Sequence, residues 1–192
     1  SGIGFVNVSV ENCGDNGIEI ISTQLANIIN TSSKNNHGHG IWLIYSSPEA
    51  ILTGVTLEAN EGYGLLISSD GIIGTNIVSV RNMAEGIQIS GNDNKITNAY
   101  VHSNSQASNS FFPNIIVFGN RNCIQDNIVR KGTLTNKPNV GISIRNDAND
   151  NLITNNDCYE GGNSAGIVNA ETNTNFGAGN RNNNGSWSTN PN

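Results

Sequence analysis

The hydrophobic residues of this chain recur in a short alternating pattern. Each copy starts with glycine or asparagine, followed by an apolar residue, a variable residue and usually a second apolar residue. The seven copies occupy residues 17–20, 40–43, 64–67, 86–89, 114–117, 141–144 and 166–169, with starts 23, 24, 22, 28, 27 and 25 residues apart. Side chains alternate between the two faces of a strand, so each copy predicts a short strand with its apolar residues on one face.

A second apolar segment lies about ten residues after the start of these copies. It is clearest at residues 94–98, 122–126 and 151–155, and earlier forms occur at 27–30 and 50–54. Asparagines mark the turns, because Asn36, Asn60 and Asn82 each lie four residues before the glycine that starts the next copy. Glycine and asparagine tolerate the left-handed backbone of tight corners, so these positions predict corners between strands.

A period of 22–28 residues is typical of one turn of a solenoid. We therefore predict an all-β fold, a right-handed parallel β-helix solenoid of about seven coils, with the first and third residues after each glycine stacked inside. A leucine-rich horseshoe is disfavoured because the L-x-x-L-x-L frame is missing. A β-sandwich is disfavoured because it needs hairpin turns between alternating strands. We place the coils in residues 1–172 and an asparagine-rich cap or tail in residues 173–192.

Composition narrows the choice further. Asparagine and glycine supply 36 and 22 of the 192 residues, and both are poor helix formers, which excludes a helical bundle. The net charge of -6 argues against a nucleic-acid-binding protein, which would carry a basic surface. No apolar run is long enough to predict a membrane-spanning helix. The three cysteines are an odd number, and we expect small core residues instead of a disulfide framework.

Candidate chemistry gathers in two outward-facing columns of the first four coils. The residues that precede each glycine are Asn16, His39, Tyr63 and Glu85, and those two positions after it are Glu19, Trp42, Leu66 and Gln88. An imidazole that exchanges protons near neutral pH, beside a phenol, is a candidate acid/base pair. We predict His39, Tyr63 and Glu19 as catalytic residues. The predicted substrate-binding residues are Trp42, Tyr45, Asn16, Glu85, Gln88 and Lys34.

Each of these assignments has a plainer alternative. His39 could be a solvated corner residue, and Glu85 could belong to a solvated acidic face. The ring of Trp42 could stack on a sugar or pack against a partner. His37 and His39 lack a third ligand nearby in the sequence, so no metal site is predicted. The outward apolar residues around Ile116 suggest contact with a neighbouring subunit or with the tail.

The repeats resemble those of the right-handed β-helices shared by pectate-lyase-like enzymes, mannuronan (alginate) epimerases and phage tailspikes. The best local match is to the epimerase pattern N-N-x-x-H-G-F-x-I-V, which here is the segment 35–44. This resemblance implies an acid/base role for His39 and a calcium ion as the one cofactor to consider; the residues themselves predict no cofactor. The epimerase motif Y-G-[FI]-D-P-H and the paired-aspartate coil of polygalacturonases have no counterpart in this sequence.

We therefore expect an extracellular polysaccharide-recognising β-helix, with polysaccharide modification of the epimerase or lyase kind on an acidic glycan left open. The expected location is outside the cell or on a cell or virion surface. The alternative is a structural or receptor-binding β-helix without catalysis, such as a tailspike segment or a surface glycan-binding module. The expected partner is a polysaccharide, with a homotrimer or additional N-terminal coils as further partners, and with neither nucleic acid nor membrane insertion.

Overall fold

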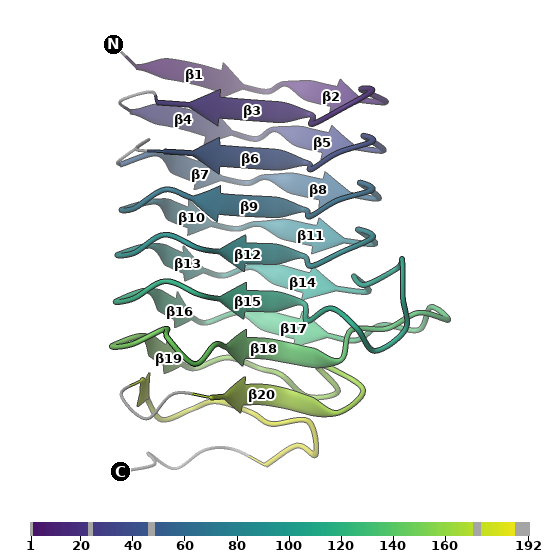
Figure 1. The fold of residues 1–192 in the computed structure, drawn as a ribbon, viewed down its shortest axis with the longest axis vertical. Coiled ribbons are helices and arrows are strands. Elements are labelled where there is room, and N and C mark those ends of the chain that lie inside the picture. The colour runs from purple at the N-terminus through teal and green to yellow at the C-terminus, as the bar shows by residue number, and fades with distance from the viewer. Residues whose placement is uncertain (1, 23–24, 46–48, 171–173, 187–192) are drawn as a thin grey trace.

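The chain winds into a single parallel β-solenoid (Figure 1). The computed structural model describes residues 2–22, 25–45, 49–170 and 174–186. Strands on the near side of Figure 1 run to the left and those behind run to the right as the chain descends, which is a right-handed winding. The described residues contain strands and turns but no helix, and thus none that is long and apolar enough to cross a membrane. The predicted fold class is confirmed.

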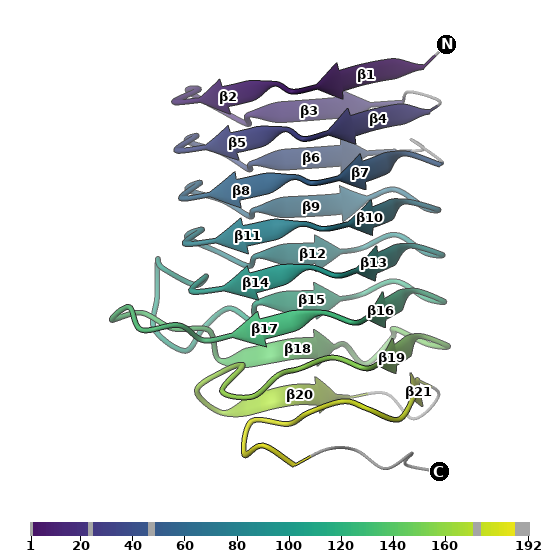
Figure 2. The ribbon, with the colours of Figure 1, turned by 180° about the vertical axis from the view of Figure 1, so that it is seen from behind.

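Three parallel sheets form the walls of the solenoid, and each coil contributes one strand to each sheet over most of its length (Figures 1 and 2). Sheet A contains β1 (Ile3–Val6), β4 (Ala26–Ile29), β7 (Ile51–Thr53), β10 (Ile73–Thr75), β13 (Lys95–Thr97), β16 (Cys123–Gln125), β19 (Leu152–Thr154) and β21 (Asn175–Phe176). Sheet B contains β2 (Ser9–Glu11), β5 (Ser32–Lys34), β8 (Thr56–Glu58), β11 (Val78–Val80), β14 (Tyr100–His102) and β17 (Ile128–Arg130). Sheet C contains β3 (Ile18–Ile21), β6 (Ile41–Ile44), β9 (Leu65–Ser68), β12 (Ile87–Ile89), β15 (Ile115–Val117), β18 (Val140–Ile144) and β20 (Ala165–Asn169).

Sheet C consists of the seven repeated segments, and its register aligns them residue by residue. Ile18 pairs with Ile41, Ile41 with Leu65, and so on down the sheet. The inward residues of the first six strands are all buried: Ile18, Ile20, Ile41, Leu43, Leu65, Ile67, Ile87, Ile89, Ile115, Val117, Ile142 and Ile144. Burying these branched side chains excludes water from the interior and drives the winding of the chain.

Buried asparagines hold the corner between sheets B and C. The side-chain amide of Asn36 donates to Oδ1 of Asn60 at 2.9 Å, Asn60 donates to Asn82, and Asn82 to Asn104 at the same distance. Each Oδ1 also accepts the backbone N–H of the asparagine one coil earlier, as Asn82 does from Asn60 at 3.0 Å. This ladder gives partners to polar groups that would otherwise be buried without hydrogen bonds. The turn asparagines predicted from the sequence are therefore structural.

The segment after the seventh coil begins by continuing the stack. β21 pairs in parallel with β19, and Arg181 forms a bridge with Asp157. Asn180 accepts the backbone N–H of Asn156 at 3.0 Å. The expected cap or tail thus starts, over residues 174–181, as part of a further coil; residue 173, where its predicted boundary lies, is outside the described residues.

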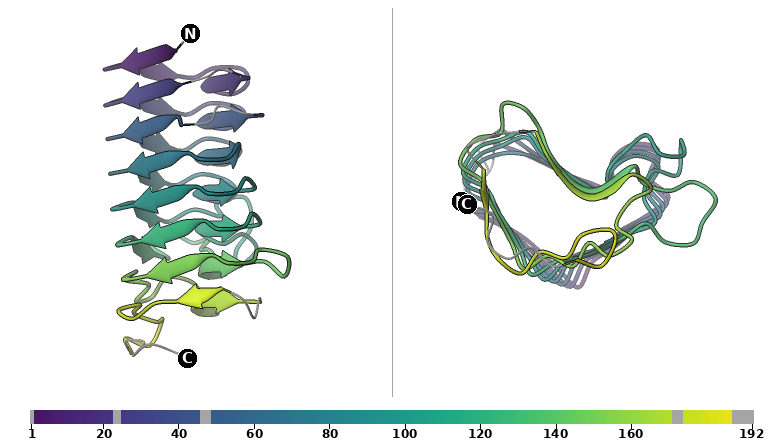
Figure 3. Two further views of the ribbon diagram at one scale, coloured as in Figure 1. Left: turned by 90° about the vertical axis from the view of Figure 1, so that its left-hand side faces the viewer. Right: turned by 90° about the horizontal axis from the view of Figure 1, so that it is seen from below.

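The cross-section of the solenoid is not round. Seen along its axis, the ribbon of sheet C bends toward the interior, and two long loops project beside the N-terminal ends of its strands (Figure 3). These loops, residues 103–114 and 131–139, are joined by hydrogen bonds such as that from the backbone N–H of Ser110 to the carbonyl of Lys137 at 2.8 Å. They stand beside β15 and β18, so they border the lower half of the outer face of sheet C.

Candidate functional site

Four side chains line up along the N-terminal ends of the strands of sheet C. We call Asn16, His39, Tyr63 and Glu85 the edge row; they directly precede the glycines that lead into β3, β6, β9 and β12. Backbone hydrogen bonds hold neighbours together, since Gly17 donates to the carbonyl of His39 at 2.9 Å and Gly40 donates to that of Tyr63 at 2.9 Å. The predicted neighbours are therefore adjacent, at a spacing of about 4.8 Å per coil.

His39 is fixed from three sides. Its backbone N–H donates to Oδ1 of Asn16 at 2.7 Å, and its ring Nδ1 accepts the backbone N–H of Tyr63 at 3.1 Å. The ring lies 4.7 Å from that of Tyr63 at 32° and 5.4 Å, perpendicular, from Trp42 (centroid distances). Because Nδ1 accepts a hydrogen bond, the neutral imidazole carries its proton on Nε2. The ring therefore offers a donor to a ligand.

Two glycines make room for this arrangement. A Cβ atom on Gly62 would overlap Nδ1 of His39, and one on Gly38 would overlap Oδ1 of Asn16. Neither position has a left-handed backbone, so the demand is for space and not for an unusual turn. Gly62, one coil after His39, therefore leaves the space for the imidazole ring, and Gly38 leaves the space for the Asn16 side chain that holds the His39 backbone.

Glu85 closes the row with a buried carboxyl group. Its side chain is 6% exposed, and among the described residues Oε2 has no hydrogen-bond partner. Burial raises the pKa of Glu85 to about 7, although a hydrogen bond from its own backbone opposes the shift. The alternative of a solvated Glu85 is wrong, because the loop after β14 packs beneath the preceding turn, where the backbone N–H of Ser105 donates to the carbonyl of Ala84 at 2.8 Å.

The surroundings of the row keep its imidazole and its phenol neutral near pH 7. Burial lowers the pKa of His39, which the carboxylates of Asp15 and Glu19 partly offset. Burial, reinforced by Glu85, raises the pKa of Tyr63. The row thus presents an uncharged imidazole and an uncharged phenol, with a carboxyl group that is half protonated at about pH 7.

The second predicted column runs down the outer face of sheet C in continuous register. Glu19 pairs with Trp42, Trp42 with Leu66, and Gln88 pairs with Leu66 on one side and with Ile116 on the other. Glu19 accepts the side-chain amide of Asn16 at 2.8 Å, which joins the column to the edge row. The indole N–H of Trp42 donates to Ser68 at 3.3 Å, and its ring is half-buried. We call the edge row and this column together, over the first four coils, the sheet C site.

Two predicted residues lie apart from this site. Tyr45 follows the C-terminal end of β6, whereas His39 precedes its N-terminal end, and Tyr45 is 72% exposed. Lys34 is on β5 in sheet B, where its ammonium lies 3.5 Å from Glu58. Arg81, a second cation of these coils, pairs with the same carboxylate. The structure therefore gathers Asn16, His39, Tyr63, Glu85, Glu19, Trp42 and Gln88, but neither of these two cations joins them.

In the described part of the chain, no group of three or more His, Cys, Asp or Glu side chains could hold a metal ion. His37 lies 3.6 Å from Glu61 as an exposed pair.

The burial of Glu85 was the main feature that the sequence did not predict. Its signal is the spacing of 28 residues between Gly86 and Asn114, against 22–24 for the coils before it. Those additional residues belong to the loop that hydrogen-bonds to the turn directly before Glu85. The same loop carries Phe111, which is 68% exposed beside the half-buried Phe112.

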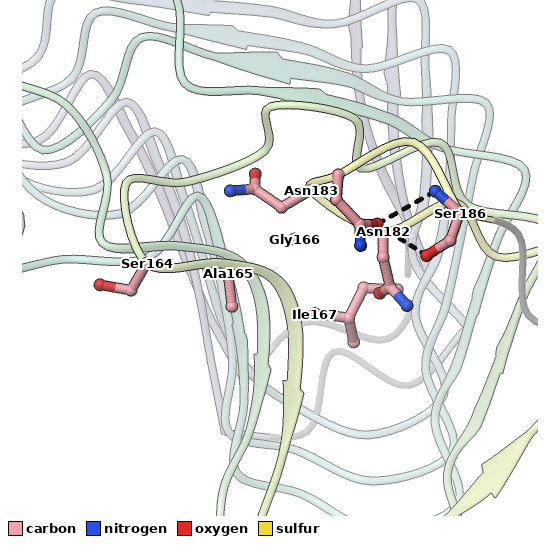
Figure 4. A pocket seen from close by; sticks show the side chains of 8 residues that line it. Ser164, Ala165, Gly166, Ile167, Asn182, Asn183 and Ser186 are labelled. Carbon is pink, nitrogen blue, oxygen red and sulfur yellow. Dashed lines mark hydrogen bonds between the residues drawn. The ribbon is translucent and has the colours of Figure 1, made fainter.

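A pocket of about 450 Å³ lies at the other end of the solenoid (Figure 4). Its lining residues are Ser164, Ala165, Gly166, Ile167, Asn182, Asn183, Asn184 and Ser186. Ser186 donates from both its backbone and its hydroxyl to Oδ1 of Asn184 (3.0 and 2.6 Å), which ties the lining loop to itself. Two strands of sheet C, β18 and β15, separate β20 from β12, the last strand of the sheet C site, so this pocket is no part of that site.

Solved structures share this fold. The A-module of the mannuronan C-5 epimerase AlgE6 of Azotobacter vinelandii matches with a TM-score of 0.71 and 15% identity, over 93% of this chain and 54% of that one. The AlgE4 A-module of the same organism matches at 0.62 and 15%, over 91% and 57%. Pectate lyase Pel9A matches at 0.56 and 15%, over 90% and 52%.

The present chain thus spans about half the length of these three structures. No protein-family model matches the sequence, and no curated protein matches it. At 15% identity the likeness shows the fold, a parallel β-helix of the pectate-lyase-like kind.

Proposed function

We propose that the protein recognises a polysaccharide laid along the outer face of sheet C, over the first four coils. The observation that carries this proposal is the array of His39, Tyr63, Trp42 and Gln88 over neighbouring coils, which presents hydroxyl-binding groups beside a flat indole. Aromatic faces stack on the apolar faces of sugar rings, and fixed polar groups select their hydroxyls. An array with one set of groups every ~4.8 Å suits a polymer better than a single sugar.

The fold neighbours support a polymer ligand. Two of them are named as epimerases of mannuronan and one as a pectate lyase, so all three act on polysaccharides. Their fold is that of this chain, and the sheet C site lies on an outer face that a long chain can follow. A polysaccharide ligand also accounts for the proposed location outside the cell or at a cell or virion surface.

Recognition is favoured over acid/base catalysis by the geometry of His39. A general base needs a free lone pair within reach of the substrate proton. Nδ1 of His39 already accepts the N–H of Tyr63, and the remaining nitrogen carries the proton. A glycosidase-type pair is disfavoured too, since Glu19 and Glu85 are three coils apart, about 14 Å, against about 5–9.5 Å for catalytic carboxyl pairs.

Binding measurements on a glycan array, followed by calorimetry with each hit, test the proposal. We expect Trp42→Ala and His39→Ala to weaken binding at least tenfold. Tyr100→Ala is the matched control, because Tyr100 is a partly exposed aromatic residue on the outer face of sheet B. No binding by the wild-type protein to any glycan, or equal losses in all three variants, would refute the proposal.

Catalysis is the second candidate, and Glu85 is the observation that favours it. A carboxyl group with a pKa of about 7 beside a phenol could donate a proton at neutral pH. Incubation with alginate and with pectin, while unsaturated products and exchange of solvent deuterium are followed, tests this. Turnover that is lost in Tyr63→Phe and Glu85→Gln would establish an enzyme; absence of turnover leaves recognition as the function.

A further inference from the structure

The cations of this protein avoid the sheet C site. All nine lysine and arginine side chains are described, and they lie elsewhere. Lys34 and Arg81 pair with Glu58 on the side of sheet B, and Arg130 and Arg181 lie around Asp157. Of the remaining five, Arg121 pairs with Asp93, Arg145 lies over Phe118, Lys95 is on sheet A, and Lys131 and Lys137 are in the loop after β17.

Carboxyl groups, in contrast, surround the site. The charges of Asp15 and Glu19 raise the pKa of His39, and the charge of Glu85 raises the pKa of Tyr63. Glu61 lies at the same corner, two residues before Tyr63, and pairs with the exposed His37. In the first four coils, the charged groups closest to His39 are therefore the carboxylates of Asp15 and Glu19, and the remaining groups of the site are amides, a phenol, an imidazole and an indole.

A polyuronate would be a poor ligand for such a surface. Each of its sugars carries a carboxylate, and binding would remove that charge from water without a cation to compensate. Its repeat would also place these carboxylates beside Glu19 and the row, where like charges repel at short range. A neutral sugar meets neither cost.

We infer that the sheet C site binds a neutral polysaccharide and discriminates against polyuronates. This inference rests on the proposed function and narrows its substrate class. The Nε2–H of His39 and the hydroxyl of Tyr63 donate to sugar oxygens, while Glu19 and the side-chain oxygen of Gln88 accept sugar hydroxyls. Trp42 carries the apolar face of one ring.

A divalent cation is the one agent that could reverse this preference, because it could bridge Glu19 or Asp15 to a uronate. The described residues contain no cluster able to hold such an ion alone. The test must therefore include calcium and a chelator as separate conditions.

Calorimetry at pH 6 would compare neutral β-glucan, mannan and xylan with polymannuronate and polygalacturonate, each with calcium and with EDTA. We expect at least one neutral polymer to bind at least tenfold more tightly than either polyuronate under both conditions. Glu19→Gln should raise the affinity for polyuronate relative to the neutral polymer several-fold. Glu160→Gln, an exposed carboxylate near the C-terminal coil, should leave that ratio unchanged.

Polyuronate binding that matches or exceeds neutral binding, with EDTA or only with calcium, would overturn the inference while leaving polysaccharide recognition intact. Binding to none of the five polymers, nor to any glycan on the array, would instead refute the proposed function. Loss of neutral binding in Trp42→Ala, with retention in Tyr100→Ala, would show that the discrimination belongs to the sheet C site.

Discussion

Glu85→Gln should remove a specific pH dependence from the stability of the protein. The native pKa of Glu85 is about 7, against an ordinary value of 4.5. The native state therefore holds the proton more tightly than the unfolded chain, and the associated stability is complete below pH 4.5. It is lost as pH rises toward 7, and the loss is full above that value. The pKa difference of about 2.5 corresponds to about 3 kcal/mol of unfolding free energy.

Urea denaturation at pH 4.5, 6 and 8 measures this contribution. The buried glutamine costs some stability at every pH, so the informative quantity is the change in unfolding free energy between pH 4.5 and pH 8. We expect that change to be about 3 kcal/mol less destabilising in Glu85→Gln than in the wild type. Glu160→Gln serves as the control, because its carboxylate is exposed.

Identical pH profiles for Glu85→Gln and the wild type would refute the reasoning. They would mean that the carboxyl group reaches water in solution, and that the loop after β14 does not cover it. A difference of the same size in the Glu160→Gln control would show that the slope reflects general charge and not burial.

Three substitutions or reagents test the packing elsewhere in the molecule. Asn82→Ala should destabilise the protein by about 3 kcal/mol in urea denaturation, because it leaves the backbone and side-chain N–H groups of Asn60 buried without their acceptor. The control is Asn27→Ala, which changes an exposed residue of sheet A and should cost little stability. Equal losses of stability in the two variants would contradict the role of the ladder. Gly62→Ala should displace the His39 ring and weaken glycan binding about tenfold, seen by calorimetry and by changed imidazole NMR shifts; wild-type binding would exclude the tight packing described. A thiol reagent should modify Cys13 and Cys123 in the native protein but Cys158 only after unfolding, because Cys158 is fully buried and burial raises the pKa of its thiol. Mass spectrometry identifies the modified cysteines, and rapid modification of all three in the native protein would disprove this.

The repeating part of the fold could be predicted from sequence because each coil repeats the same physical requirement. A glycine enters the strand, two branched side chains point inward, and an asparagine closes the corner. In sheet C this rule alone correctly assigns the register of Glu19, Trp42 and Gln88. It also correctly makes neighbours of His39 and Tyr63.

This rule could not predict how the chain folds where inserted residues interrupt the repeat. In the fifth coil the ladder asparagine is Asn104, ten residues before Asn114, whereas in the earlier coils it lies four residues before the glycine that Asn114 replaces. The intervening residues leave the coil and return, and on the way they bury Glu85. Repeat spacing shows that residues are inserted, but their path depends on loop contacts, such as those of Gln106 with Asn136, that carry no periodic signal.

The ladder and the site have a shared consequence for how specificity is built. Backbone hydrogen bonds and the buried asparagines fix the position of each coil, so a change in an outward side chain need not move its neighbours. His39 and Tyr63 occupy equivalent positions on equal backbones, and their different chemistry comes from the side chains alone. Glu85 is the exception, because its burial depends on the loop between β14 and β15. A single substitution at His39, Trp42 or Glu19 should thus change ligand preference without moving the coils, although these three residues contact or charge one another and their effects should not be additive. A change of the loop should instead alter the charge state of Glu85 and, through it, the pKa of Tyr63.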